Sequence, residues 1–427
     1  MCTDFGNVTN RGITAVSGYA TIFTIRLGSP EKDLRDAGKH WTENIIEKAS
    51  EDFNSVELEQ DMKKLLIGIV IGFCFLLSFS MAEGMQRIDS DGYLYYMDYT
   101  GDYYSTQVMD SLRRAGYIDP GCSTFFTRNL DGDPITCRNY DIQHRVSGED
   151  STLTGLNVVL HCKPEGKYES IALADAVWCA PGDPLYRNGG PEMEGFDSSL
   201  LDILPYQCMD GINEKGLFVS IMRLDIKEGD QPGRFGVAAS MLLRYMLDDC
   251  ANVEEAIAKV DTAIVTPEDW QQCHLFVSDA QGYYALIESR NSVVSVIDTD
   301  VVTNFYLGSD DMEDYYRGGT LRENSVALVD ENGEPLYHFG YGHGYHRFVT
   351  IASQLDRFRK DGRTIMPESS ALVILRSAVQ SPYTEVTGTS MTQYSAIYNN
   401  AEKTVSIWPF QNYETEYRFD VSGKQIQ

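Results

Sequence analysis

The sequence predicts an α+β fold in which helices pack on the outside of an antiparallel sheet. Three short polar turns separate paired apolar runs, and they lie at residues 129–133, 279–282 and 399–400. Two apolar runs joined by such a turn are typical of a β-hairpin. Other segments repeat their apolar residues at helical spacing. Because hairpins outnumber strand–helix–strand crossovers, an antiparallel sheet core with external helices is favoured.

The expected elements follow one another from Cys122 to near the C-terminus. Each strand is a short apolar run bounded by a turn, and each helix repeats apolar residues at i, i+3 and i+4. We predict strands at 123–127, 135–138, 217–222, 274–277, 283–288, 394–398 and 404–408, and helices at 236–247, 251–260, 347–358 and 369–379.

The charge balance excludes some partners. The 427 residues include 63 acidic and 35 basic side chains, a formal net charge of −28. We expect no nucleic acid partner, because nucleic acid requires a basic face, and anionic membranes are equally disfavoured. One domain per ~150 residues predicts two or three domains, with a single large domain as the alternative. The nine cysteines form no Cys-x-x-Cys pair, which excludes zinc-ribbon and thioredoxin-like sites.

Residues 62–82 have the pattern of a secretory signal peptide. Lys63 and Lys64 precede an apolar run from 65 to 79, which ends in a small-x-small site. The run is shorter than the ~20 residues of a spanning helix. We interpret Met62 as the true start and residues 1–61 as an over-extended gene model, with a signal-anchor helix as the alternative. A secreted or extracytoplasmic protein without a stable membrane anchor after signal cleavage is predicted.

The first candidate for chemistry is Cys122, which follows a Pro-Gly turn. An isolated cysteine of this kind is more often a small buried hydrophobe. However, Arg138 and Asp141 follow it at sixteen and nineteen residues, within Arg138-Asn139-Tyr140-Asp141. A hairpin would return Arg138 to the side of Cys122. An arginine and an aspartate beside a thiol can stabilise the thiolate and orient a base.

These residues resemble the opening of the choloylglycine hydrolase family, which includes conjugated bile-salt hydrolases and penicillin V acylases. Acid ceramidase-type amidases open similarly, and all are N-terminal-nucleophile hydrolases. Four more motifs follow in order up to about Tyr417: Asp210-Gly211-Ile212-Asn213-Glu214-Lys215-Gly216-Leu217, a hairpin at 274–288, Val302-Thr303-Asn304 and His346-Arg347-Phe348, where histidine replaces the family's serine. Cys2 is not followed by Arg and Asp at sixteen and nineteen residues, because Gly18 and Thr21 occupy those positions. The resemblance implies a four-layer αββα sandwich.

The resemblance also implies a mechanism and a processing scheme. Cys122 is the nucleophile and its own α-amine is the base, so the chain must be cut between Gly121 and Cys122. Residues 83–121 would then be a propeptide, and 122–427 a single catalytic domain. Asp141 would bind the amine, Arg138 would favour the thiolate and Arg347 would support the cluster. The Asn304 side chain and the Asn213 main-chain N–H would form the oxyanion hole.

Simpler readings stay open for several of these residues. Asn213 suits a turn, Asn304 a strand cap and Arg347 a surface position. Cys137 suits strand packing better than a redox partnership with Cys122. Two further alternatives are a papain-like pair of Cys122 with His274, and a metal loop that contains His338, His343 and His346. We favour a substrate-facing loop over the metal, and expect no metal and no cofactor.

The predicted function is a secreted cysteine amidohydrolase that cleaves a linear amide through a thioester on Cys122. A small-molecule amide would be its partner: a bile-salt conjugate, penicillin V or an N-acyl amino acid. The first alternative is an acyltransferase with the same site, for which no basic coenzyme A patch is visible in the sequence. The second is a catalytically silent binding module of this fold. Homo-oligomer formation stays open.

Overall fold

The computed structural model describes residues 84–112, 120–143, 155–180, 190–224, 237–262, 273–290, 293–307, 341–360, 362–380 and 390–427. The chain divides into a unit of residues 1–79 and a unit of residues 80–427. The predicted gene-model extension at 1–61 and the signal peptide at 62–82 lie outside the described residues. Among the described residues, no helix is both long and apolar enough to cross a membrane.

Nine strands form the larger sheet of the second unit. Its neighbouring strands are antiparallel except for one parallel pair, β2 with β5. The spatial order is β1 (Met85–Arg87), β2 (Leu94–Tyr99), β5 (Asn157–Cys162), β6 (Ser170–Asp175), β7 (Cys208–Asn213), β8 (Phe218–Arg223), β9 (Cys273–Ser278), β10 (Tyr284–Arg290) and β11 (Val293–Ile297).

Six strands form the smaller sheet, and every neighbouring pair in it is antiparallel. The spatial order is β12 (Val301–Val302), β3 (Pro120–Arg128), β4 (Pro134–Gln143), β13 (Ser390–Asn399), β14 (Thr404–Pro409) and β15 (Tyr417–Asp420). The long strands β3, β4 and β13 are therefore the centre of this sheet. Their length fits burial against both a second sheet and a helix layer.

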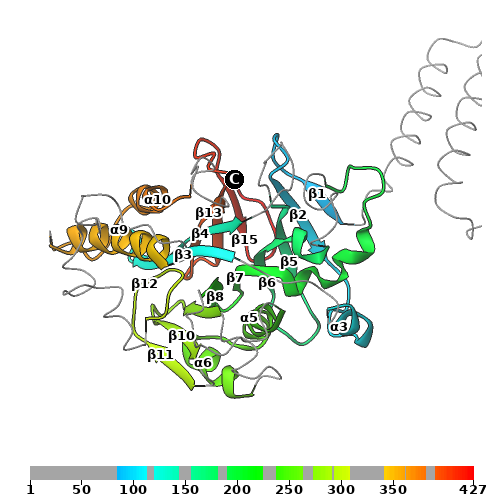
Figure 1. Cartoon of the computed structure of the whole chain (residues 1–427), viewed down its shortest axis with the longest axis horizontal. Coiled ribbons are helices and arrows are strands. Elements are labelled where there is room, and N and C mark those ends of the chain that lie inside the picture. The colour runs from blue at the N-terminus through cyan, green and yellow to red at the C-terminus, as the bar shows by residue number, and fades with distance from the viewer. Residues whose placement is uncertain are drawn as a thin grey trace, which may run out of the picture. The chain divides into compact units, whose positions relative to one another are not determined.

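Helices cover the outer face of each sheet (Figure 1). α5 (Val237–Asp249) and α6 (Val253–Thr262) contact strands β7 to β10 of the larger sheet, and α9 (Tyr341–Lys360) and α10 (Glu368–Ser377) contact β3, β4, β12 and β13 of the smaller one. The helix α3 (Thr106–Leu112) and the 3-10 helices η1 (Ala176–Cys179) and η2 (Ser198–Gln207) lie beside the larger sheet. The predicted four-layer αββα sandwich is confirmed.

Side-chain alternation along the central strands separates two hydrophobic cores. In β3, Cys122 and Phe126 belong to the core that lies between the sheets, whereas Phe125 points to the core under α9 and α10. Successive strand residues face opposite sides of a sheet, so this division follows from the sequence pattern. Cys137 also belongs to the outer core. Its side chain therefore lies on the opposite face of the sheet from Cys122, which supports packing as its role.

Residues 84–112, which we call the N-terminal segment, are part of the larger sheet although the sequence prediction places them in a propeptide. β2 pairs along its whole length with β5, from Leu94 opposite Asn157 to Tyr99 opposite Cys162. Beyond the strand, the Tyr103 hydroxyl donates to Asp248 of α5 at 2.9 Å. The larger sheet therefore includes strands from a region for which the sequence pattern predicted none.

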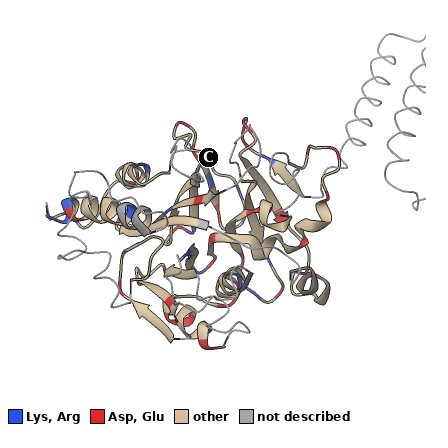
Figure 2. Ribbon diagram, in the orientation of Figure 1, with Lys and Arg blue, Asp and Glu red and all other residues tan. Residues whose placement is uncertain are grey.

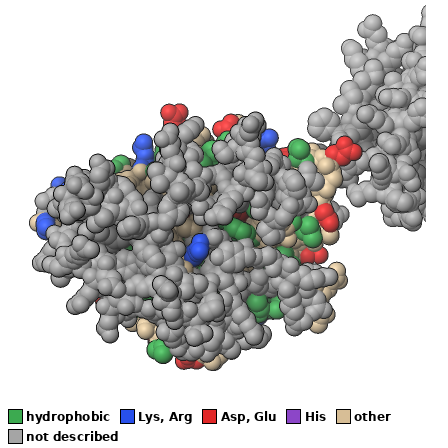
Figure 3. Space-filling model, viewed as in Figure 1, with side chains coloured by type: hydrophobic (Ala, Val, Ile, Leu, Met, Phe, Trp, Pro, Cys, Tyr) green, Lys and Arg blue, Asp and Glu red, His purple; other side chains and the backbone are tan. Residues whose placement is uncertain are grey.

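Charged side chains are distributed unevenly over the described residues. On the face seen in Figure 3, acidic groups lie along the right-hand and upper edges, and basic groups lie at the left end, along the upper edge and near the centre. Basic groups gather at the end of α9, where Arg357, Arg359 and Lys360 form the last turn (Figure 2). This end of α9 lies beside the pocket described below.

Candidate active site

The thiol of Cys122 is buried between the two sheets. Cys122 lies opposite Tyr140 in the β3–β4 pair, and Thr124 lies opposite Arg138. Residues that are two positions apart on a strand share a face, so Cys122 and Arg138 point into the same space. The Arg138 Nη2 donates to Cys122 Sγ at 3.0 Å. The hairpin that the sequence predicts therefore brings these two side chains together.

The guanidinium of Arg138 is fixed from three directions. Its Nε forms a fully buried ion pair with Asp210 of β7, its Nη2 donates to the Ile221 carbonyl at 2.7 Å, and its Nη1 donates to the Thr124 hydroxyl at 3.2 Å. From the sequence alone, Asp210 is only the first residue of a motif. Its role as counterion to Arg138 is a finding of the structure.

Asp210 is itself held by two phenol groups of β13. The hydroxyl of Tyr394 donates to Asp210 Oδ2 at 2.7 Å, and the hydroxyl of Tyr398 donates to Oδ1. All three side chains are buried. A buried carboxylate requires such donors as well as its cation, since unpaired lone pairs are costly away from water. The Arg138 orientation is therefore defined by both sheets.

Asp141 lies on the other face of β4 from Arg138 and Tyr140, toward α9. It accepts hydrogen bonds from Thr392 Oγ1 at 2.6 Å and from Gln380 Nε2 at 2.9 Å, and it pairs with Arg347 Nη1 at 3.1 Å. Burial raises the pKa of the Asp141 carboxyl, and the charge of Arg347 opposes that rise. The carboxylate thus holds Arg347 in place.

Arg347 and Asn304 contact the backbone of Cys122. Arg347 Nη1 donates to the Cys122 carbonyl at 2.6 Å, and Nη2 donates to Asn304 Oδ1 at 2.6 Å. The Cys122 amide donates to the same Asn304 oxygen at 2.8 Å. Asn304 Nδ2 donates to the Arg223 carbonyl at 2.7 Å, at the end of β8. Five of the six predicted residues therefore form one buried cluster: Cys122, Arg138, Asp141, Asn304 and Arg347.

The sixth predicted residue, Asn213, does not join this cluster. Its main-chain N–H donates to the Leu217 carbonyl at 3.0 Å, and its Nδ2 donates to the carbonyls of Leu247 and Cys250 at 2.9 and 2.7 Å. The assignment of its N–H to an oxyanion hole is therefore wrong, because the β7–β8 turn already uses that donor. Asn213 closes this turn and ties it to the end of α5.

The electrostatic environment of Cys122 disfavours its thiolate form. Burial raises the pKa of the Cys122 thiol to about 12, and the charge of Arg138 only partly offsets this effect. Asp141 adds to the rise. Arg138 thus acts in the predicted direction but does not outweigh desolvation. A reactive thiolate requires a further positive charge or a base near Sγ.

The alternative nucleophile pairing with His274 is not supported by the geometry. His274 Nδ1 lies 3.1 Å from Glu288 Oε1, and Nε2 lies 2.6 Å from the Thr303 carbonyl. Both ring nitrogens are therefore engaged away from Cys122. Of the predicted histidine loop, His338 and the side chains of His343 and His346 lie outside what the structure describes.

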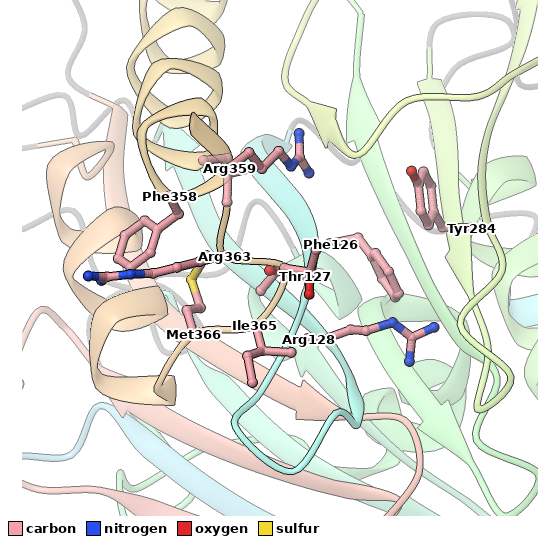
Figure 4. Close-up of a pocket in the computed structure, with 11 residues that line it drawn as sticks. Phe126, Thr127, Arg128, Tyr284, Phe358, Arg359, Arg363, Ile365 and Met366 are labelled. Atoms are coloured by element: carbon pink, nitrogen blue, oxygen red, sulfur yellow. The ribbon is translucent and has the colours of Figure 1, made fainter. Parts of the chain in front are cut away.

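A pocket of about 170 Å³ lies at the other end of β3 from Cys122 (Figure 4). Its wall includes Phe126 and Tyr284, and three arginines contribute to it, Arg128, Arg359 and Arg363. In Figure 4 the guanidinium of Arg363 points to the opposite side from the other two, so the three do not converge on one point. None of the six predicted site residues lines this pocket.

The four layers and the buried cysteine cluster define an N-terminal-nucleophile hydrolase fold. The sequence model of the family described as acyl-coenzyme A:6-aminopenicillanic acid acyl-transferase matches residues 127–406. The chain belongs to this family. The match confirms the predicted kinship with choloylglycine hydrolases and penicillin acylases, and with it the prediction of an enzyme. It begins five residues beyond Cys122, so it includes the other cluster residues but not the cysteine.

Several solved structures are partly similar to the chain. Two are variants of conjugated bile acid hydrolase from Clostridium perfringens, at 16% identity with TM-scores of 0.44 and 0.45, covering 72% of this chain and 96% and 97% of those chains. A third is penicillin V acylase from Agrobacterium tumefaciens, at 17% identity with a TM-score of 0.41, covering 70% of this chain and 86% of that chain. No curated protein matches the chain in sequence.

Proposed function

We propose that this protein is a cysteine amidohydrolase whose nucleophile, Cys122, is released by a backbone cut after Gly121. The observation that carries the proposal is that separate side chains contact three atoms of Cys122. Arg138 contacts Sγ, Asn304 Oδ1 accepts from the nitrogen, and Arg347 donates to the carbonyl oxygen. A cysteine that merely fills core volume needs none of these contacts.

The cut supplies the base that the uncut site lacks. Inside the strand, the nitrogen of Cys122 is an amide and cannot accept a proton. After hydrolysis of the Gly121–Cys122 bond it is an α-amine, with an ordinary pKa of roughly 7.7–8.0. Such an amine is partly neutral near pH 7 and can take the thiol proton. The resulting ammonium beside Sγ then stabilises the thiolate, together with Arg138.

The catalytic cycle has two covalent steps. The thiolate attacks the carbonyl carbon of the substrate amide, the C–N bond breaks, and the leaving amine takes the proton from the Cys122 ammonium. Water then attacks the thioester and gives a proton to the now neutral Cys122 amine, the C–S bond breaks, and the carboxylic acid is released with the thiolate–ammonium pair restored. Asn304 Nδ2 is the donor that we assign to the oxyanion, for which such donors contribute roughly 2.7–4 kcal/mol.

The family name favours a second candidate, transfer of the acyl group to an amine instead of to water. A coenzyme A donor would need a basic surface for its phosphates. Arg128, Arg359 and Arg363 are candidates, but they line a pocket at the far end of β3 and do not converge. Hydrolysis is therefore the preferred reaction. Substrates to test are conjugated bile salts, penicillin V and N-acyl amino acids, with and without an acceptor amine.

We further propose that the protein is exported through the segment 62–82 and that the N-terminal segment stays bound after the cut. The pairing of β2 with β5 and the contacts of Tyr103 support the second point. The predicted propeptide would then be a retained part of the enzyme and not a discarded one.

The test is the intact mass of the purified protein combined with turnover. We expect a chain that begins at Cys122 and amide hydrolysis by the cut form. Cys122→Ala should leave the chain uncut and lower turnover by about 10⁴-fold or more, as for other nucleophile deletions. Cys137→Ser is the matched control, because that thiol faces the other side of the same sheet. Near-normal turnover by Cys122→Ala would overturn the proposal.

A further inference from the structure

The loop that carries Asn304 is tied at both ends to one buried pair of side chains. Residues 303–307 follow β12, and Asn304 is the second of them. At the start of this loop, the Thr303 carbonyl accepts from His274 Nε2 at 2.6 Å. At its end, the Leu307 amide donates to Glu288 Oε1 at 2.9 Å. His274 Nδ1 lies 3.1 Å from the same Glu288 oxygen.

The pair belongs to the larger sheet, whereas the loop continues from the smaller one. His274 lies on β9 and Glu288 lies opposite it on β10. Both side chains are buried, at 0% and 3% exposure. β12 pairs with β3, the strand of Cys122. The pair therefore sets the position of the Asn304 loop from the sheet that faces it.

The hydrogen bonds require a proton within the pair. A carbonyl oxygen can only accept, so His274 Nε2 must carry a hydrogen for Thr303. The contact between Nδ1 and Glu288 Oε1 needs a second hydrogen, which either the imidazolium or the carboxylic acid supplies. Each alternative preserves both ties to the loop. An apolar ring at position 274 would remove the first tie and the contact between His274 and Glu288.

Asn304 in turn contacts the reacting residue. Its Oδ1 accepts from the Cys122 amide and from Arg347, and its Nδ2 donates to the Arg223 carbonyl. Displacement of the loop backbone would therefore move three contacts at once. Misplacement of a catalytic group by about 1 Å can lower a rate by ~10²-fold.

We infer that His274 and Glu288 are positioning residues for Asn304. The inference rests on the proposed function, because it assigns Asn304 to the oxyanion. Neither side chain touches Cys122 in the described contacts, so their effect passes through the backbone of residues 303–307. A positioning role predicts that kcat falls, while KM and the reactivity of the Cys122 thiol are kept.

The experiment compares His274→Phe, Glu288→Ala and Glu288→Gln, with kcat expressed per cut molecule. We expect His274→Phe and Glu288→Ala to lower kcat by about 10²-fold with KM within about 3-fold. Glu288→Gln can keep an oxygen acceptor at the position that both Leu307 and a protonated His274 Nδ1 contact, and should retain kcat within about 5-fold. Alkylation of Cys122 by iodoacetamide should proceed at the wild-type rate in all three.

The matched control is His161→Phe. His161 on β5 also lies between two acceptors, Asp98 at 2.7 Å and Glu169 at 2.9 Å, but it contacts no residue of the Asn304 loop. It should leave kcat unchanged. If His274→Phe does not fold, the two Glu288 variants decide the question.

Equal kcat in Glu288→Ala and wild type would overturn the inference. The inference would also be overturned if kcat fell together with a large change in KM and slower alkylation of Cys122, because this combination indicates general disruption of the site. Failure of the proposed function is recognised separately, because Cys122→Ala would then keep its turnover whatever the His274 variants do.

Discussion

The stretches of chain on either side of Gly121 join different sheets. Before it, β2 pairs with β5 in the nine-stranded sheet, and after it, residues 122–128 continue β3 at the centre of the six-stranded sheet. The first stretch is held by strand pairing and tyrosine contacts, and the second carries Cys122, the proposed nucleophile. The proposed cut falls within β3, after its first two residues, and would leave β2 and residues 122–128 of β3 paired in their sheets. Retention of the N-terminal segment and catalysis at Cys122 can therefore be tested independently.

The largest expected effect comes from the ion pair between Asp210 and Arg138, which orients the Arg138 guanidinium beside Cys122. Asp210→Asn removes the charge that balances buried Arg138. Breaking a buried pair from one side costs about 3–5 kcal/mol of stability. We expect turnover to fall on the order of 10³-fold, because the guanidinium no longer holds its place beside the thiol. Tyr394→Phe, which removes one hydrogen bond to Asp210, should lose less than Asp210→Asn in both thermal unfolding and turnover assays.

The two asparagines from the sequence prediction should behave in opposite ways. Asn304→Ala should lower kcat by about 10²–10³-fold with little change in thermal stability. Asn213→Ala should leave kcat within about 3-fold but lower the free energy of unfolding by about 1–3 kcal/mol, because two buried carbonyls lose their donor. Steady-state kinetics and thermal melts on both variants check this. A large kcat loss in Asn213→Ala would return that residue to the active site.

The cut itself should change the chemistry of the thiol. In the uncut chain the pKa of Cys122 is raised to about 12, so the thiol stays protonated at pH 8 and alkylation becomes fast only near the alkaline end of the range. The new ammonium beside Sγ lowers that pKa after the cut. We expect the cut form to react with iodoacetamide at least about tenfold faster at pH 8. Peptide mapping of Cys122 measures this, and equal rates would contradict it.

The smallest expected effect lies on the other side of Gly121. Tyr103→Phe removes a buried donor from Asp248, and Tyr104 also donates to that carboxylate at 2.7 Å. Stability should fall by about 1–3 kcal/mol while kcat of the cut enzyme stays unchanged. Gel filtration of the cut protein should show the N-terminal segment co-eluting with the remainder, and only denaturant should release it. Release under native conditions would mean that the segment is a removable propeptide after all.

The strands and site residues from Cys122 onward were predicted well from the sequence, whereas the strands before Gly121 were not predicted. Hairpins with clear turn signals, such as the one between β3 and β4, are local features, and the offsets from Cys122 to Arg138 and Asp141 follow from that hairpin's register. β2, by contrast, is a tyrosine-rich stretch whose partner β5 begins at residue 157. A parallel pairing over that separation leaves no local signal. β2 therefore owes its strand conformation to its pairing with β5 in the folded protein.

The same limit explains the errors in the site. Asn213 stands in the family motif, and nothing in its neighbourhood shows that the Leu217 carbonyl already uses its N–H. The motif nevertheless contained a residue of the site, Asp210, whose three partners Arg138, Tyr394 and Tyr398 come from distant strands. A signal was available: Asp210 lies between Met209 and Gly211 in a buried strand, and a buried carboxylate requires a cation or hydrogen-bond donors.

The long sequence separation of the site residues has a consequence for the order of events during synthesis. Cys122 contacts Arg347, which lies 225 residues later, and Asp141 depends on Thr392, which lies 251 residues beyond it. A ribosome completes nearly the whole chain before these partners exist. On the proposed mechanism, a nascent or truncated polypeptide lacks the means to cut itself. The appearance of a new terminus at Cys122 would thus report that translation and folding have both reached completion.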